Sequence, residues 1–237
     1  MSYGKWIGGG LGWAFGGPIG AILGFAIGSM FDSAKKGKYE HGRTRSGDFG
    51  VSLLILSAAV MKADGKVLKS EVDFVKRFFV RQFGVEETRK KMLLLKEILK
   101  QNIPVQDVCL QIRQYMDIAS RLQLMHFLFG TALADGHIDT SEINVIHFIA
   151  GYLGISQGDY DSIKAMFVKD TESAYKILEI YPDASDQEVK AAYRKMAVKY
   201  HPDKVAHLGG KIQKVAKEKF QQLNNAYGEI KKERMMV

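Results

Sequence analysis

The sequence predicts an all-α protein of three parts: an N-terminal glycine-rich transmembrane helix, a helical bundle, and a C-terminal helical hairpin. Three observations support this prediction. Between Lys5 and Asp32 the chain carries no charged residue. From about Gly47 to Lys169 the apolar residues recur at helical spacing, and strand-like alternation is scarce. After Glu172 a basic amphipathic segment begins at a capping box and ends at a proline.

Composition limits the classes of function that need to be considered. The net charge of +8 would suit nucleic acid or an anionic membrane if it were concentrated, but it divides between residues 35–45 and residues 190–219. The single cysteine, Cys109, excludes an intramolecular disulfide, and its apolar neighbours predict a buried side chain. The sequence has no nucleotide-binding loop and no nucleophile–base constellation, so we expect neither an enzyme nor a bound cofactor.

The first element, residues 1–31, is the predicted transmembrane helix. A helix of about 20 apolar residues spans a bilayer, and the uncharged run is longer than the apolar core of a secretion signal. Glycines recur in it at every fourth position and form one helix face that a second helix can approach closely, which predicts a homodimer. Pro18 can kink the helix, and a flexible leader or a peripheral hairpin are the alternatives. The glycine stripe consists of Gly8, Gly12, Gly16, Gly20, Gly24 and Gly28.

The next segment, residues 32–46, is a basic juxtamembrane linker. Five basic residues follow the apolar run closely, whereas only Lys5 and the terminal amine precede it. The positive-inside bias therefore predicts a single-pass protein of the bacterial cytoplasmic membrane, with its C-terminal domains in the cytoplasm. The same basic residues could contact anionic lipid. They are Lys35, Lys36, Lys38, Arg43 and Arg45.

The middle domain, residues 47–169, contains an internal repeat. The sequence ADGKV at residues 63–67, followed by SEV, matches ADGHI at residues 134–138, followed by SEI. Asp-Gly is a common turn dipeptide. Each copy therefore ends an apolar helix, turns and starts another helix, which predicts two related helical hairpins that pack together.

The repeat also places four carboxylates near its turns. Such a group could bind a hard divalent cation. The alternative is a role in turns and caps: Asp139 and Glu142 have capping-box spacing, whereas Glu71 has Leu68 at the equivalent cap position. Neither copy has the full acidic ladder of an EF-hand. The candidate metal ligands are Asp64, Glu71, Asp135 and Glu142.

The duplicated ADG…SE pattern, over roughly residues 50–168, resembles the TerB-like domain, a helical module of tellurite-resistance proteins. This resemblance implies a TerB-like helical bundle. The family is associated with acidic clusters proposed to bind metal and with stress responses at membranes, which keeps the divalent metal as an open alternative.

The C-terminal part, residues 172–237, begins with a short helix and a turn. Ser185 and Glu188 form a capping box that starts a second helix. That helix is predicted to bury Val189 and Met196, to expose its basic residues, and to end at Pro202. A third helix begins near residue 212 and packs against the second through spaced apolar residues.

The run YRKMAVKYHPDK at residues 193–204, preceded by AYKILEI and followed by FQQLNNAY, resembles the J domain of DnaJ-family co-chaperones. The J domain addresses DnaK-type ATPase chaperones. The resemblance implies a basic helix that steers an acidic chaperone surface, Asp203 as acceptor for an arginine of the chaperone, and His201 and Pro202 as loop contacts. The implied partner-binding residues are Lys190, Tyr193, Arg194, Lys195, Lys199, His201, Pro202, Asp203 and Phe220.

The order of anchor, TerB-like domain and J domain resembles the DjlA-like group of membrane-anchored co-chaperones of bacteria, as does the long loop around residues 207–211. This implies a co-chaperone that stimulates ATP hydrolysis by a DnaK-type chaperone at the membrane. Nucleic acid is not expected as a partner, because Asp186 and Glu188 interrupt the basic face. The alternatives are a metal- or envelope-stress sensor acting through the TerB-like domain, and a structural membrane scaffold.

Overall fold

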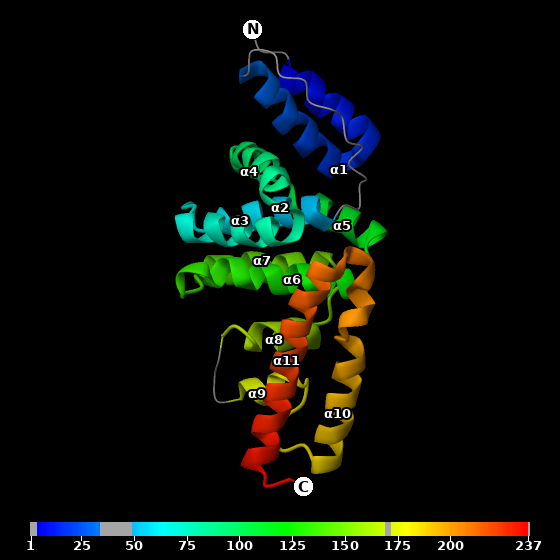
Figure 1. Ribbon diagram of the computed structural model, residues 1–237. Helices are drawn as coiled ribbons and strands as arrows, with labels where there is room; N and C mark the ends of the chain where they lie inside the picture. Colours follow the sequence, from blue (N-terminus) through cyan, green and yellow to red (C-terminus); the bar gives the residue numbers. More distant parts are fainter. Residues whose placement is uncertain (1–3, 34–48, 169–171, 237) are drawn as a thin grey trace. The chain divides into compact units, whose positions relative to one another are not determined.

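The computed structural model describes residues 4–33, 49–168 and 172–236, and every regular element in these ranges is a helix (Figure 1). The predicted all-α fold is confirmed. Most of the predicted basic linker, residues 34–46, lies outside the described residues. The helices are α1 (Gly4–Ser33), α2 (Phe49–Met61), α3 (Lys69–Phe83), α4 (Val85–Leu99), α5 (Val105–Tyr115), α6 (Ile118–Ala132), η1 (Leu133–Asp135), α7 (Thr140–Tyr152), α8 (Gln157–Ala165), α9 (Ser173–Ile177), α10 (Asp186–Lys199), η2 (Pro202–Leu208) and α11 (Gly210–Glu233).

The chain divides into two compact units. The first comprises Met1–Met116 and Thr131–Gly154, and the second comprises Asp117–Gly130 and Ile155–Val237. The boundaries of these units differ from the domain boundaries predicted at residues 169–172. Most of α6 and the whole of α8 pack with the C-terminal helices.

The core of the first unit is built on α2, whose side chains are buried on every face. A helix that is apolar all round has no side suited to water and is therefore enclosed by its neighbours. In this unit α2 contacts α3, α4, α5 and α7. Cys109 on α5 is buried and unpaired, as predicted, and burial raises the pKa of its thiol to about 12.

Both copies of the repeat turn as predicted. Gly65 and Gly136 have φ of 81° and 94°, in the left-handed region that glycine adopts without strain. The side chains of Asp64 and Asp135 each accept a hydrogen bond from the backbone N–H two residues later, at 2.8 and 3.0 Å. The Asp-Gly dipeptides therefore act as turn formers, and α3 and α7 begin after them.

The N-terminal element differs from the predicted single helix. At Gly17 the backbone has φ 60° and ψ −152°, which is not helical, and α1 is formed by two helical arms (Figure 1). Pro18 follows directly and lacks the N–H that would continue the helix. The kink that the sequence allows at Pro18 is therefore present, and it is sharp enough that the two arms fold back on each other as a hairpin.

The glycine stripe lets the two arms meet. A Cβ atom at Gly12 would lie 2.0 Å from the carbonyl oxygen of Gly20, so only glycine permits this approach. Further out, Gly9 faces Phe25 of the other arm. The stripe thus serves a contact within the chain, and a homodimer through the same glycines stays a prediction.

The hairpin also contacts α4 and α5. The side-chain amide of Gln111 donates to the carbonyl oxygen of Gly16 at 2.7 Å and accepts from the N–H of Ile19 at 3.0 Å. These two bonds satisfy backbone groups that the break leaves without helical partners. Among the described residues, no helix combines the length and the apolar character needed to cross a membrane.

In the second unit α10 and α11 form the predicted C-terminal hairpin (Figure 1). The ring of Tyr193 stacks on that of Tyr227, with centroids 4.2 Å apart, and the Tyr193 hydroxyl donates to Asn224 at 2.9 Å. Val189 and Met196 are buried, as predicted. The short helix α9 packs against both α8 and α11.

Candidate partner-binding site

The helix α10 begins and ends as its sequence predicts. The Ser185 hydroxyl accepts from the N–H of Glu188 at 3.3 Å, and the Glu188 carboxylate accepts from the N–H of Ser185 at 2.7 Å. This reciprocal capping box fixes the first turn. The helix ends at Lys199, and Pro202 opens the short helix η2. We call residues 201–209 the HPD loop.

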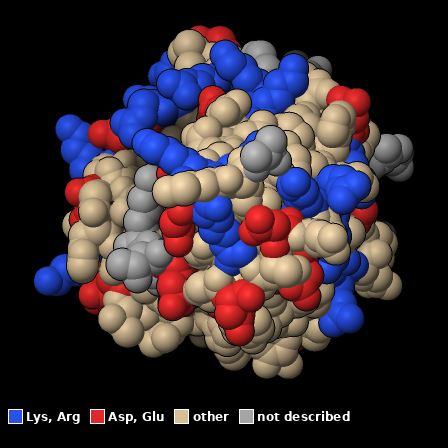
Figure 2. All heavy atoms as spheres, turned by 90° about the horizontal axis from the view of Figure 1, so that it is seen from below, with Lys and Arg blue, Asp and Glu red and all other residues tan. Residues whose placement is uncertain are grey.

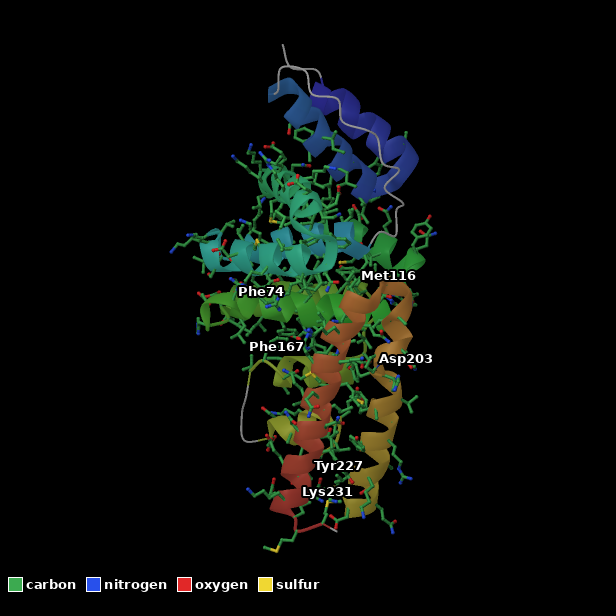
Figure 3. The ribbon with its side chains drawn as sticks, in the orientation of Figure 1. Phe74, Met116, Phe167, Asp203, Tyr227 and Lys231 are labelled. Atoms are coloured by element: carbon green, nitrogen blue, oxygen red, sulfur yellow. The ribbon has the colours of Figure 1, made fainter. Side chains whose placement is uncertain are left out.

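The HPD loop presents Asp203 to solvent. Its side chain is 74% exposed, and that of His201 is 51% exposed, whereas Pro202 is buried. The Nδ1 atom of His201 accepts a hydrogen bond from the N–H of Asp203 at 3.3 Å. The His201 ring meets Phe220 edge to face, with centroids 5.9 Å apart. His201 and Phe220 therefore support the loop that carries the exposed carboxylate of Asp203. Figure 3 labels Asp203.

A residue that the sequence did not single out orients this carboxylate. The side-chain amide of Gln213, in the first turn of α11, donates to Oδ1 of Asp203 at 2.9 Å. Gln213 lies ten residues after Asp203, and no motif or spacing in the sequence links the two residues. One carboxylate oxygen of Asp203 is thereby fixed by the protein itself.

Three of the predicted basic residues of α10 lie on its surface. Lys190, Arg194 and Lys195 are exposed, and Arg194 donates from Nε to the carbonyl of Lys190 at 3.2 Å. Figure 2 shows Lys and Arg side chains over the upper part and the right edge of the face that it draws, and several Asp and Glu side chains around its centre. The exposed positive charge suits the steering of an acidic surface.

Lys199 differs from that prediction. Its side chain is only 27% exposed, and its Nζ lies 2.5 Å from Asp159 and 3.2 Å from Glu179. The expectation of an exposed Lys199 is therefore wrong, because two carboxylates from α8 and the α9–α10 connection hold the ammonium group. Tyr193 packs between α10 and α11, and its contact with a partner stays a prediction.

The carboxylate that holds Lys199 is itself buried. Asp159, on α8, is 4% exposed and accepts from the hydroxyl groups of Tyr200 and Ser156, each at 2.8 Å. Burial alone would raise the pKa of Asp159, but the hydrogen bonds from Lys199, Ser156 and Tyr200 together lower it below its usual value. The charge of Lys199 is stabilised in turn: burial opposes it, but Asp159 and Glu179 raise the pKa of Lys199.

A second lysine is enclosed beneath the loop. Lys219 on α11 is 2% exposed, its Nζ has no hydrogen-bond partner, and the amine lies 4.0 Å from the centre of the Tyr200 ring. Burial lowers the pKa of Lys219 to about 7. Lys219 is therefore a core residue and not part of the exposed basic surface.

The candidate metal ligands occupy helix ends in the first unit. Glu71 accepts from the N–H of Leu68 at 2.7 Å, and Glu142 accepts from the N–H of Asp139 at 2.9 Å. Glu71 and Glu142 therefore cap α3 and α7 in the same way. This half of a capping box uses only the backbone N–H of the cap residue, so the side chain at that position does not matter. The expectation that Leu68 at the cap position leaves Glu71 without a capping role is therefore wrong.

Glu71 and Glu142 also contact each other. Both side chains are buried. Burial and, to a smaller extent, the charge of Glu142 raise the pKa of Glu71 to about 7, although the hydrogen bond from the Leu68 N–H acts in the opposite direction. Within the described part of the chain, no three His, Cys, Asp or Glu side chains are placed to hold a metal ion. Caps and turns are the roles that these contacts show, and metal binding by the four carboxylates stays a prediction.

Three protein families match successive parts of the chain. Residues 1–46 match the Co-chaperone DjlA transmembrane domain, residues 51–165 match Tellurite resistance protein TerB, and residues 173–235 match the DnaJ domain. The predicted order of anchor, TerB-like domain and J domain is thereby confirmed.

Curated relatives match over most of the chain. A Co-chaperone protein DjlA of Vibrio parahaemolyticus is 31% identical and covers 88% of this chain and 90% of its own length. The protein of the same name from Photobacterium profundum is 28% identical over 98% of this chain and 99% of its own length. That of Coxiella burnetii is 25% identical over 99% and 98%. No solved structure matches the chain.

Proposed function

The chain belongs to the DjlA family of co-chaperone proteins, and from this premise we propose that its J domain stimulates ATP hydrolysis by a DnaK-type chaperone at the cytoplasmic face of the bacterial inner membrane. The observation that carries the proposal is the exposed Asp203 carboxylate at the end of a helix with a basic surface. The protein acts in this proposal as a regulator of another protein's ATPase and not as an enzyme.

The proposed recognition has a long-range part and a short-range part. Lys190, Arg194 and Lys195 attract an acidic chaperone surface and raise the rate of encounter. Asp203 then accepts hydrogen bonds from an arginine of the chaperone, and a bidentate pair of this kind fixes orientation as well as energy. The J domain accelerates hydrolysis only if it binds the hydrolysing conformation of the chaperone more tightly than the resting one.

In this proposal a membrane anchor keeps the co-chaperone activity at the bilayer. The match of residues 1–46 to a transmembrane domain and the basic residues that follow the apolar segment support an anchor with the helical units on the cytoplasmic side. A tethered co-chaperone raises the effective concentration of chaperone action near the bilayer without any new contact.

Single-turnover ATP hydrolysis by a DnaK-type chaperone tests the proposal. The full chain in detergent or nanodiscs is compared with His201→Gln and Asp203→Asn, and Asp183→Asn, an exposed aspartate before α10, is the matched control. We expect stimulation by the wild type and the control, and a loss of about tenfold or more in both loop variants, since each removes a charge-assisted or orienting contact. Equal stimulation by Asp203→Asn and the wild type would refute the proposed role of the loop.

A further inference from the structure

The HPD loop is held at both ends by side chains that precede the J domain in sequence. The family match to the DnaJ domain begins at residue 173, yet α8 and most of α6 belong to the same compact unit as α9, α10 and α11. The contacts that join them involve Lys199 and Tyr200, just before His201-Pro202-Asp203, and His207, four residues after it.

Before the loop, the contact is made by Asp159 of α8. Its Oδ1 atom accepts from the Tyr200 hydroxyl at 2.8 Å and lies 2.5 Å from Nζ of Lys199. Its Oδ2 atom accepts from the hydroxyl of Ser156, the N-cap of α8. A buried carboxylate with three donors has one geometry, and it therefore fixes the residues adjacent to His201.

Near the end of the loop, the contact is made with the start of α6. The Nε2 atom of His207 lies 3.1 Å from Oδ2 of Asp117 and 3.2 Å from the hydroxyl of Ser120. Asp117 also accepts from the N–H of Ser120 at 2.7 Å, so its carboxylate is oriented by the first turn of α6. His207 and Asp117 are half exposed, so this contact is weaker than that of Asp159.

Between these contacts, side chains of α6 and of the loop line one small cavity. Leu122 and Gln123 of α6, with Tyr200, His201 and Lys219, line a cavity of about 20 Å³. That volume is about the room that one water molecule needs.

We propose that Asp159 is a positioning residue of the J domain: by holding Lys199 and Tyr200, α8 fixes the HPD loop in the conformation that the chaperone recognises, and the working co-chaperone module includes α8 and the first part of α6. This inference rests on the proposed function. Asp203 and the basic residues Lys190, Arg194 and Lys195 stay exposed while the loop is held, so the contact supports the site without covering it.

Two measurements on the full chain test the inference. Hydrogen exchange of residues 201–209 reports how firmly the loop is held in the protein alone, without any chaperone. Single-turnover ATP hydrolysis reports its consequence, as a maximal stimulation and a half-saturating concentration. The variants are Asp159→Asn, which removes the charge, Tyr200→Phe, which removes one hydroxyl and keeps the ring, and Asp159→Glu as the conservative replacement. Asp161→Asn on the same helix is the matched control.

We expect exchange in residues 201–209 to rise about tenfold in Asp159→Asn and less in Tyr200→Phe, while exchange in α3 and α7 stays unchanged. Maximal stimulation should fall about tenfold while the half-saturating concentration changes little, because the steering charges remain. Asp159→Glu should recover part of the loss, and Asp161→Asn should resemble the wild type.

Unchanged exchange of the loop in both Asp159→Asn and Tyr200→Phe would overturn the inference, whatever the ATPase result. Faster exchange with unchanged stimulation would overturn the functional part of it. If the wild type does not stimulate ATP hydrolysis, but the exchange data show that the loop is held as described, the proposed function is refuted and the structural contact is still supported.

Discussion

At the scale of single residues, the two lysines beside the HPD loop show that a basic residue adds to the charged surface only where the fold leaves it exposed. Lys199 and Lys219 both belong to a basic stretch of sequence, yet one is partly buried in an ion pair and the other is enclosed with no hydrogen-bond partner. Steering of a partner depends on exposed charge. The basic surface of the J domain is therefore smaller than its lysine content indicates.

The ionisation of Glu71 bears on the stability of the first unit. Its pKa is raised to about 7, whereas in the unfolded chain it has the ordinary value near 4.5. Between these two values the folded state binds more protons than the unfolded state, so the free energy of unfolding decreases as pH rises through this range. The stabilisation is fully present below about pH 4.5 and is lost above about pH 7.

Replacement of Glu71 by glutamine should remove this pH dependence. Glutamine cannot ionise, and its amide oxygen can still accept from the N–H of Leu68. One pKa unit corresponds to about 1.4 kcal/mol, and coupling with Glu142 reduces the full effect, so we expect Glu71→Gln to gain about 1–2 kcal/mol at pH 8 and almost nothing at pH 5. Urea unfolding at the two pH values measures it.

The matched control is Glu86→Gln, an exposed glutamate in the first turn of α4, which should show no such gain. An equal gain from Glu71→Gln at pH 5 and pH 8 would mean that the buried carboxyl group is not ionised in the way its surroundings indicate.

At the scale of elements, the sequence predicted what local chemistry decides. The capping box at Ser185, the end of α10 before Pro202 and the turn at Asp64-Gly65 depend on residues a few positions apart, and all three are present. The contact between Asp159 and Tyr200 joins residues 41 positions apart, and no periodicity or spacing indicates it. The same holds for Gln111, which contacts α1 from α5.

The N-terminal hairpin shows the limit of a periodic signal. A glycine at every fourth position makes a helix face that accepts a close neighbour, but the pattern does not say whether that neighbour is another chain or the same one. In this chain Gly17 and Pro18 let one arm supply a neighbour for the other, because a positive φ followed by a residue without an N–H stops the helix. A second chain at the same glycines stays a prediction.

The hairpin can be measured with spin labels at Gly10 and Ile27, two exposed positions on opposite arms, in a chain whose buried Cys109 is replaced by alanine. A continuous helix would separate these positions by about 25 Å. Packed arms, with axes about 8–10 Å apart, should give a distance well below that value. Gly12→Leu should lengthen the distance, because its Cβ would overlap the Gly20 carbonyl.

Ala14→Leu adds the same bulk at an exposed position of the same arm and is the matched control. A distance near 25 Å in the unmodified hairpin, or an equal response to Gly12→Leu and Ala14→Leu, would contradict the folded-back arrangement.

At the scale of the whole molecule, the units that pack together are not the units that the families delimit. The TerB match ends at residue 165 and includes α8, whereas α8 packs with α9 in the second compact unit. Family boundaries follow the similarity of sequences, but cooperative opening follows buried contacts. The end of the TerB match falls inside the second packed unit. We therefore expect α8, which lies on the TerB side of that boundary, to depend for its stability on the helices of the J domain.

Native-state hydrogen exchange with two core variants decides between these boundaries. Leu223 of α11 is fully buried in the second unit, and Ile98 of α4 is fully buried in the first. Truncation of such a side chain to alanine costs about 2–5 kcal/mol. We expect Leu223→Ala to speed exchange in α8 together with α10 and α11, and to leave α3 and α4 unchanged.

Ile98→Ala should do the reverse, with faster exchange in α3 and α4 and little change in α8. The free energies of opening of α8 and α10 should agree within about 1 kcal/mol in each variant, since one cooperative unit opens as a whole. If α8 instead follows α4 in both variants, it opens with the TerB-like helices, and a contact from α8 could not hold the HPD loop independently of them. The positioning role of Asp159 therefore requires that α8 share its stability with the J domain.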